Sequence, residues 1–285
     1  MAIRGEELEM GSPCDLGCGW KRSLRQSCLE IGRRKGGLKL KILSSPRAAD
    51  LDRMNTEEVR EHFLVEDLFV PGHIRMAYTG LDRLIVGGVM PETEIELPAL
   101  RETGTGYFTE RREVGVINIG DKGVVAAGRQ SYELDHLDCL YIGTGEERVT
   151  FANRPGGPAA FYLLSAPAHR KYPTRKARLA EATVHEIGNP DNASKRRLVQ
   201  YIHEGGIESC QLVMGYTELA PGNVWNTWPP HTHLRRSEIY FYFDLGENLL
   251  IHLLGEPLRT RHLIVRDRQV VLSPPWSMHC GAGAG

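Results

Sequence analysis

Two histidines and a glutamate lie close together in the segment that begins at His231. One residue separates His231 from His233, and Glu238 follows at the start of the aromatic run Glu-Ile-Tyr-Phe-Tyr-Phe. On a strand, side chains two positions apart point to one face, so the two imidazoles converge. A third histidine, His279, follows Pro-Pro-Trp-Ser-Met further along the chain. Three neutral imidazoles and one carboxylate suit a divalent metal and leave room for a water or a substrate oxygen.

The histidine pair alone is weak evidence, because such pairs are common on surfaces and in packed cores. The longer spacing is more specific: His-x-His, four residues, a glutamate before an aromatic strand, and Pro-x-Trp-x-x-His about 40 residues later. This spacing predicts a metal site in the second half of the chain. The first half has Thr-Glu-Arg-Arg-Glu at 109–113 before a strand but no histidine pair, so we expect no metal there. His136 and His169 are isolated and are expected to be packed or hydrogen-bonded.

The composition limits the class of protein that can present such a site. The chain has 285 residues, of which 41% are hydrophobic and 25% charged, and its net charge is −1. These values are typical of a globular protein and argue against a nucleic-acid binder or a polybasic membrane protein. Six cysteines are too few for a disulfide scaffold, and the N-terminus has no secretory h-region. We therefore expect a cytoplasmic protein.

Short β-strands are the elements that must position the site. A helix is predicted from an N-cap at Asn55 or Thr56 to about His62, because two glutamates follow in its first turn. A second short helix is predicted near 175–184. The predicted strands are residues 63–70, 83–90, 113–119, 132–142, 148–152 and 160–165, then 197–202, 210–219, 238–243, 249–254 and 262–272. Two such groups of about 100 residues predict an all-β protein with two antiparallel, jelly-roll-like barrels.

The chain divides into four predicted segments. Residues 1–44 carry nine basic and five acidic residues, about +4 net, with poor hydrophobic periodicity, and are expected to be a disordered extension. Residues 45–165 form a first, metal-free barrel, and residues 166–195 a linker. Residues 196–285 form the metal-binding barrel. The chain stops six residues after His279, so we expect this second barrel to be incomplete.

The metal motif resembles the cupin signature, a glycine, His-x-His-x4-Glu, a second glycine and a later Pro-x-Gly-x-x-His. Two departures are a longer spacer after Gly222 and Trp276 in place of the last glycine. The wider sequence resembles the 4-deoxy-L-threo-5-hexosulose-uronate ketol-isomerase family, whose members have two cupin barrels. The stretches that carry this resemblance are residues 63–72, 82–91, 107–120, 166–176, 210–227, 230–243 and 261–279.

The resemblance implies one Zn²⁺ ion per chain, bound by His231, His233, Glu238 and His279. It implies the conversion of 5-dehydro-4-deoxy-D-glucuronate into 3-deoxy-D-glycero-2,5-hexodiulosonate during pectin breakdown, and a homohexamer. The substrate carries a carboxylate, so Arg235 and Arg236 are candidates to bind it, and otherwise they are solvated or at a subunit contact. No catalytic base is identified from the sequence.

Two other functions remain open at this stage. A metal-dependent cupin dioxygenase also uses three histidines and a glutamate, and oxygen uptake would distinguish it. An inactive, sugar-binding bicupin fragment would show neither metal nor turnover. Leu234, Ser237 and Trp228 replace residues that are usual in the family beside the metal ligands, and they are the positions most expected to alter the site.

Overall fold

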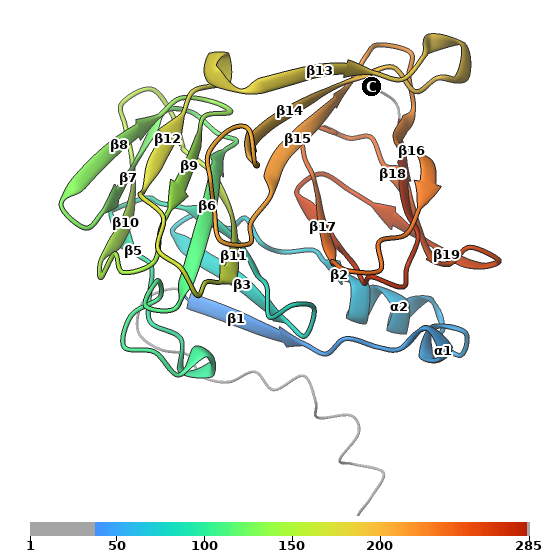
Figure 1. Cartoon of the computed structure of the whole chain (residues 1–285), viewed down its shortest axis with the longest axis horizontal. Coiled ribbons are helices and arrows are strands. Elements are labelled where there is room, and N and C mark those ends of the chain that lie inside the picture. Colours follow the sequence, from blue (N-terminus) through green and yellow to red (C-terminus); the bar gives the residue numbers. More distant parts are fainter. Residues whose placement is uncertain (1–37, 284–285) are drawn as a thin grey trace, which may run out of the picture.

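Two antiparallel β-barrels lie side by side in the computed structural model, which describes residues 38–283 (Figure 1). The strands of the first barrel lie within residues 38–177, and those of the second barrel lie within residues 183–282, with residues 64–65 added to it. Only two short α-helices occur among the described residues, α1 (Ala48–Leu51) and α2 (Thr56–Phe63). The prediction of an all-β protein is confirmed.

The first barrel packs a seven-stranded sheet against a four-stranded sheet. In spatial order the larger sheet contains β1 (Leu38–Leu43), β3 (His73–Thr79), β4 (Ile85–Met90), β11 (Phe161–Pro167), β6 (Arg112–Asn118), β9 (Cys139–Ile142) and β12 (Arg175–Ala177). The smaller sheet contains β5 (Ile95–Glu96), β10 (Val149–Asn153), β7 (Gly123–Ala127) and β8 (Gln130–Leu134). All neighbours are antiparallel except β1 and β3, which run parallel.

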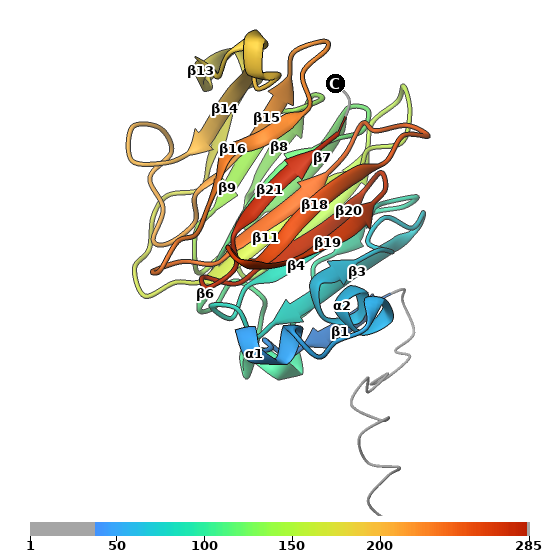
Figure 2. The same cartoon turned by 90° about the vertical axis from the view of Figure 1, so that its right-hand side faces the viewer.

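The second barrel contains three smaller sheets, two of which carry the candidate metal ligands (Figure 2). One sheet has the order β16 (Trp225–His231), β21 (His279–Ala282), β18 (Leu250–Glu256) and β19 (Arg259–Val265). The second has β17 (Glu238–Tyr242), β20 (Gln269–Ser273) and β2 (Leu64–Val65). The third has β13 (Thr183–Ile187), β14 (Arg196–Ile202) and β15 (Met214–Leu219).

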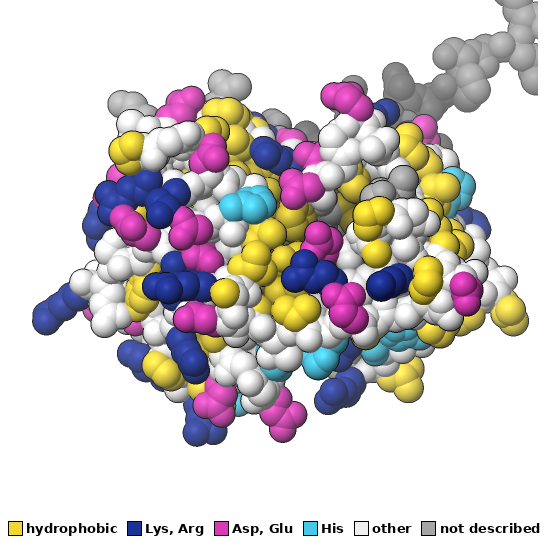
Figure 3. Space-filling view, turned by 90° about the horizontal axis from the view of Figure 1, so that it is seen from above, with side chains coloured by type: hydrophobic (Ala, Val, Ile, Leu, Met, Phe, Trp, Pro, Cys, Tyr) yellow, Lys and Arg dark blue, Asp and Glu magenta, His cyan; other side chains and the backbone are white. Residues whose placement is uncertain are grey.

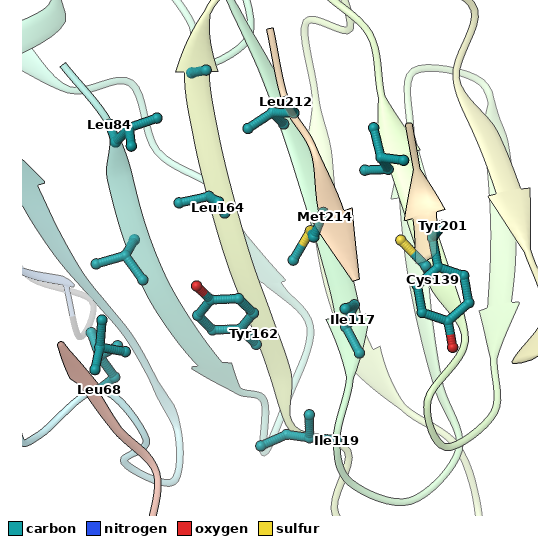
Figure 4. Packing of buried hydrophobic residues seen from close by; sticks show 14 of the residues in the cluster. Leu68, Leu84, Ile117, Ile119, Cys139, Tyr162, Leu164, Tyr201, Leu212 and Met214 are labelled. Carbon is teal, nitrogen blue, oxygen red and sulfur yellow. The ribbon is translucent and has the colours of Figure 1, made fainter. Parts of the chain in front are cut away.

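The largest hydrophobic cluster lies between the barrels rather than inside either one. Tyr162 and Leu164 of β11 and Ile117 of β6 pack with Met214 of β15 (Figure 4). Each fully buried large apolar side chain contributes about 1.5–3 kcal/mol. The approach is close at Gly115 of β6, where an added Cβ would lie 2.4 Å from the Met214 sulfur. The two barrels therefore share this central core, and each has a further hydrophobic cluster of its own.

Residues 48–65 form an N-terminal arm that packs on the second barrel although it precedes the first. The arm comprises α1, α2 and β2, and β2 pairs with β20. Val59 and Phe63 of α2 are buried in the core of the second barrel with Leu254 and Val271. The division at residue 165 therefore does not describe how this arm is packed.

The helix predicted from Asn55 is confirmed. The Asn55 side chain accepts a hydrogen bond from the backbone amide of Glu58, and the Glu58 carboxylate accepts one from the backbone amide of Asn55. This reciprocal arrangement satisfies two amides that the first helical turn leaves without partners. The sequence signal was correct because capping is a local interaction.

Three other predictions about elements were wrong. The strand predicted at 63–70 is limited to Leu64–Val65. The helix predicted near 175–184 is absent: this part contains β12, the 3₁₀ turn Leu179–Glu181 and the beginning of β13. The predicted linker thus contributes strands to two sheets. Within the predicted disordered extension, residues 38–43 form β1 and Ser44 follows it, while residues 1–37 lie outside the described residues.

Two further 3₁₀ turns, Arg101–Thr103 and Pro190–Asn192, complete the regular elements of the described residues. Among residues 38–283, no helix has the length and apolar character needed to span a membrane.

Candidate metal centre

Strand register brings the four predicted ligands together at one end of the second barrel. His231 is the last residue of β16 and lies directly opposite His279, the first residue of β21. Glu238 is the first residue of β17 and lies opposite Ser273, the last residue of β20. His233 belongs to the loop that joins β16 to β17. The histidine pair therefore converges through a strand end and a loop, not along one continuous strand.

The ligating atoms of these side chains are close to one another. One ring nitrogen from each of His231, His233 and His279 lies within 4.8 Å of the others. The Nε2 atoms of His231 and His233 are 3.2 Å apart. The Glu238 carboxylate is beside this group, with Oε1 3.0 Å from His233 Nε2 and Oε2 3.4 Å from His279 Nε2. The histidines thus form a compact donor set with a carboxylate at its edge.

The orientation of the rings suits a metal ion. His231 Nδ1 lies 2.9 Å from the carbonyl oxygen of Pro229, and His279 Nδ1 lies 3.3 Å from the Ser273 hydroxyl. A carbonyl oxygen only accepts, so the Pro229 contact holds the proton on His231 Nδ1 and leaves its Nε2 lone pair available to a metal. His279 Nε2 is buried and has no hydrogen-bond partner among the described residues. A buried ring nitrogen without a partner is energetically costly unless something binds it. The three histidines and Glu238 therefore fit a divalent metal.

Glu238 is held by two neighbours. The Tyr240 hydroxyl donates a hydrogen bond of 2.5 Å to Oε2, and the Arg236 guanidinium donates to Oε1 at 2.9 and 3.1 Å. Burial acts to raise the pKa of Glu238, but the Tyr240 hydrogen bond, the nearby His279 and Arg236 outweigh it, and the net pKa is lowered. The carboxylate is therefore ionised, as a metal ligand must be.

Two of the histidines, His279 and His233, are held in their neutral form. Burial lowers the pKa of His279 to about 4, and Glu238 only partly opposes this effect. Burial also lowers the pKa of His233. Neutral imidazole is the form that binds metals, so the site does not require a proton to leave these rings near neutral pH.

The donor set opens into a cavity of about 1180 Å³ between the two barrels. His231, His233, Glu238 and Tyr240 line it on one side, and apolar residues such as Tyr162 of the first barrel line it on the other. In the view from above, the face between the barrels is hollowed, with hydrophobic side chains in the hollow and charged side chains around it (Figure 3). A small polar substrate can therefore reach the histidines.

The two arginines proposed for a substrate carboxylate are placed differently. Both line the cavity. Arg236 is bound to Glu238, and its Nη2 also lies 3.0 Å from His233 Nε2. Arg235 is exposed and makes no hydrogen bond or ion pair to the residues that the structure describes. Arg235 is thus the one whose guanidinium remains available to an anion.

Other residues that the sequence singled out lie apart from this centre. Cys280 is buried and donates to the carbonyl oxygen of Asn226, on the other side of β21 from the donor set. In the first barrel, Glu113 accepts hydrogen bonds from Tyr141 and from the backbone amides of residues 210–212, so it links the barrels. His169 was expected to be packed or hydrogen-bonded rather than a ligand, and its Nδ1 lies 3.3 Å from the Cys210 sulfur.

Sequence reasoning missed three polar side chains around the donor set, Tyr240, Ser273 and Asp82. Tyr240 is in the aromatic run after Glu238, two positions from it on the same strand face, and that spacing could have identified it. Ser273 reaches the site only through the pairing of β17 with β20. Asp82 comes from the other barrel, and no local pattern indicates its position.

The fold and the donor set together define a cupin-type protein with two barrels. Two solved structures share this fold. An iolB-like protein from Salmonella typhimurium has a TM-score of 0.56 at 14% identity, over 71% of this chain and 83% of that protein. An oxalate decarboxylase from Lactobacillus farciminis has a TM-score of 0.50 at 12% identity, over 71% and 73%. The prediction of a cupin fold is confirmed.

Residues 81–285 match the KduI/IolB family, and the chain belongs to this family. It is 52% identical over 248 residues to the 4-deoxy-L-threo-5-hexosulose-uronate ketol-isomerase of Opitutus terrae, covering 86% of this chain and 90% of the relative. It is 49% identical over 237 residues to the protein of the same name from Shouchella clausii, covering 82% and 86%. These relatives confirm the resemblance seen in the sequence and the prediction of an isomerase enzyme.

Proposed function

We propose that this chain is a zinc-dependent ketol-isomerase that converts 5-dehydro-4-deoxy-D-glucuronate into 3-deoxy-D-glycero-2,5-hexodiulosonate. The observation that carries the proposal is the convergence of His231, His233, His279 and Glu238 at the wall of a cavity that is open to a small molecule. The names of the relatives supply the substrate, and the resemblance supplies the metal and the place of the reaction in pectin catabolism.

The reaction moves a proton between adjacent carbons through an enediolate, so negative charge develops on a substrate oxygen. A zinc ion held by these four side chains would act as a Lewis acid and stabilise that charge without redox chemistry. Tyr240 and Arg236 hold the Glu238 carboxylate by hydrogen bonds and keep it ionised. Their hydrogen bonds also fix its orientation toward the three histidines.

The substrate carboxylate is assigned to Arg235. Its guanidinium lies on the cavity wall two residues from His233 and has no carboxylate partner among the described residues. Arg197 also lines the cavity, but its charge is paired with Glu186 and Glu218. An unpaired guanidinium binds a carboxylate through two parallel hydrogen bonds, so it can orient the sugar chain relative to the donor set.

The test is to measure metal content and isomerase activity on the same purified protein. We expect about one zinc per chain, loss of activity after chelation, and recovery when zinc is returned. His279→Gln should lose the metal, whereas His262→Gln, a change at an exposed histidine of β19, should retain it. Full activity in metal-free protein would contradict the proposal, and oxygen uptake with bound iron would indicate a dioxygenase instead.

The resemblance also supports a homohexamer in the cytoplasm, and we include both in the proposal. Light scattering after gel filtration gives the mass of the assembly directly. A monomer that turns over the substrate would contradict the hexamer and leave the activity in place.

A further inference from the structure

One hydrogen bond joins the first barrel to the loop that carries the candidate ligands. The backbone amide of Ser237 donates to Asp82 Oδ2 at 2.9 Å, although the two residues are 155 positions apart. Ser237 lies directly between Arg236 and Glu238 in the chain. The position of its backbone therefore helps to set where both of those side chains begin. Asp82 itself makes no hydrogen bond or ion pair with any of the four candidate ligands.

The turn that presents Asp82 is tightly built. It joins β3 to β4, and the amide of Leu84 donates to the carbonyl of Leu81 at 2.9 Å. Its two central residues, Asp82 and Arg83, have φ values of 47° and 55°. A turn with two left-handed residues favours asparagine, aspartate or glycine, so arginine at the second position is unfavourable unless the surroundings hold it.

The surroundings do hold this turn. Arg112 of β6 is 4% exposed, and its Nη2 donates to the carbonyl of Arg83 at 2.8 Å. The buried Thr79 hydroxyl donates to the carbonyl of Leu81 at 3.1 Å. The Asp82 carboxylate is thus presented on a rigid support that belongs to the first barrel.

We infer that Asp82 is a positioning residue for the metal centre: it anchors the Ser237 amide and thereby orients Glu238 and Arg236 toward the three histidines. The inference rests on the proposed function, because it assumes that these side chains bind a metal. The ligand loop between His231 and Glu238 pairs with no strand among residues 38–283, and Leu234 within it is 94% exposed. The Asp82 anchor adds a backbone contact from the other barrel to a loop whose other hydrogen bonds are made by side chains. The first barrel thereby takes part in the centre without contributing a ligand.

The test compares three variants that separate the hydrogen bond from the shape of the turn. Asp82→Gly accepts the left-handed backbone but removes the carboxylate. Asp82→Asn keeps an acceptor oxygen, and asparagine tolerates the left-handed backbone conformation of this position. Arg83→Gly relieves the neighbouring left-handed residue and leaves Asp82 in place. For each folded variant, zinc affinity is measured by competition with a chromophoric chelator, and kcat and KM are measured separately.

We expect Asp82→Gly to weaken zinc binding by about 10- to 100-fold, the usual effect of removing a residue that orients metal ligands. The variant should also lower kcat more than it raises KM. Asp82→Asn and Arg83→Gly should stay within about threefold of the wild type, well below that range. Asp82→Gly with wild-type zinc affinity, or Asp82→Asn as impaired as Asp82→Gly, would overturn the inference. Wild-type protein that binds no zinc would instead contradict the metal centre itself.

Discussion

The Tyr240 hydroxyl connects the aromatic run of β17 to the chemistry of the centre. It donates to Glu238 Oε2 and lies 3.3 Å from the Thr227 hydroxyl, while its ring is largely buried. Burial raises the pKa of Tyr240 well above its usual range, so the hydroxyl keeps its proton and remains a donor. Its role is to stabilise a carboxylate, which requires a residue that does not ionise.

Replacing Tyr240 by Phe should shift the pH dependence of metal binding. Loss of the donor removes one of the contacts that lower the pKa of Glu238, so that pKa rises and the carboxylate takes up a proton at a higher pH. Metal binding should then fail at a higher pH on the acid side, with zinc affinity at neutral pH reduced by about tenfold. Zinc affinity measured over a pH series checks this.

Tyr242→Phe is the matched control for that experiment. Tyr242 is two positions further along the same strand, and its hydroxyl contacts His252 Nδ1 at 2.7 Å in the buried core. We expect an unchanged pH profile for this variant. Equal profiles for Tyr240→Phe and the wild type would show that the hydroxyl has no influence on Glu238.

The assignment of Arg235 predicts a separation of kinetic parameters. Arg235→Gln should raise KM by about tenfold or more, because a charged hydrogen bond contributes about 1.5–3 kcal/mol, with little change in kcat or zinc content. Arg197→Gln removes a cavity arginine whose charge is already paired, so KM should hardly change. A KM unaffected by Arg235→Gln would remove this residue from substrate binding.

Among the elements, those defined by local interactions could be predicted and those defined by distant partners could not. The cap at Asn55 and most of the alternating strands were predicted correctly, because the sequence signal for each lies within a few neighbouring residues. The run at 63–70 is apolar, but Leu68 is buried between the barrels outside any strand, so the same hydrophobic signal gave a wrong element. The Ala- and Arg-rich stretch near 175 pairs with β9, which composition does not indicate.

The candidate site follows the same division. The four candidate ligands could be named from their spacing, and three of them, His231, Glu238 and His279, lie at the ends of strands. Strand β16, which ends at His231, was not predicted, because it contains Pro229 and Pro230, and proline lacks the amide that a central strand needs. The contacts of Ser273 and Asp82 depend on strand register and on the docking of the barrels, and neither can be obtained from a local pattern.

The capping of α2 gives a prediction at the level of one element. Asn55→Ala removes the acceptor for the Glu58 amide and should lower the free energy of unfolding by about 1 kcal/mol. Asn55→Asp keeps an acceptor oxygen and should be near the wild type. Chemical denaturation of both variants measures the difference. Equal stability of Asn55→Ala and the wild type would mean that α2 contributes little to the second barrel.

At the scale of the whole molecule, the shared core and the N-terminal arm make the barrels interdependent. Tyr162 of β11 stacks on Phe241 of the second barrel, with ring centroids 4.4 Å apart and planes inclined by 7°. Residues 48–65 cover the second barrel and lead directly into the first. We therefore expect the described part of the chain to unfold as one unit.

The tryptophans allow that expectation to be tested. Trp225, Trp228 and Trp276 all belong to the second barrel, while the fourth, Trp20, lies outside the described residues. Leu134→Ala creates a cavity in the core of the first barrel and should cost about 2–5 kcal/mol. The transitions followed by tryptophan fluorescence and by far-UV circular dichroism should fall together. An unchanged fluorescence transition beside a lowered dichroism transition would show that the barrels unfold separately.

The arm also has a consequence for the order in which the protein is made. Leu64 pairs with Val271, and the two are separated by 271 − 64 = 207 positions. At about 5–20 residues per second, a ribosome needs about 10–40 s to cover that distance. During this interval the first barrel can close, while Phe63 and Leu64 remain exposed because their partners in the second barrel have not been synthesised. His279 emerges later still, so the complete donor set cannot assemble on a nascent chain until His279 has left the ribosome.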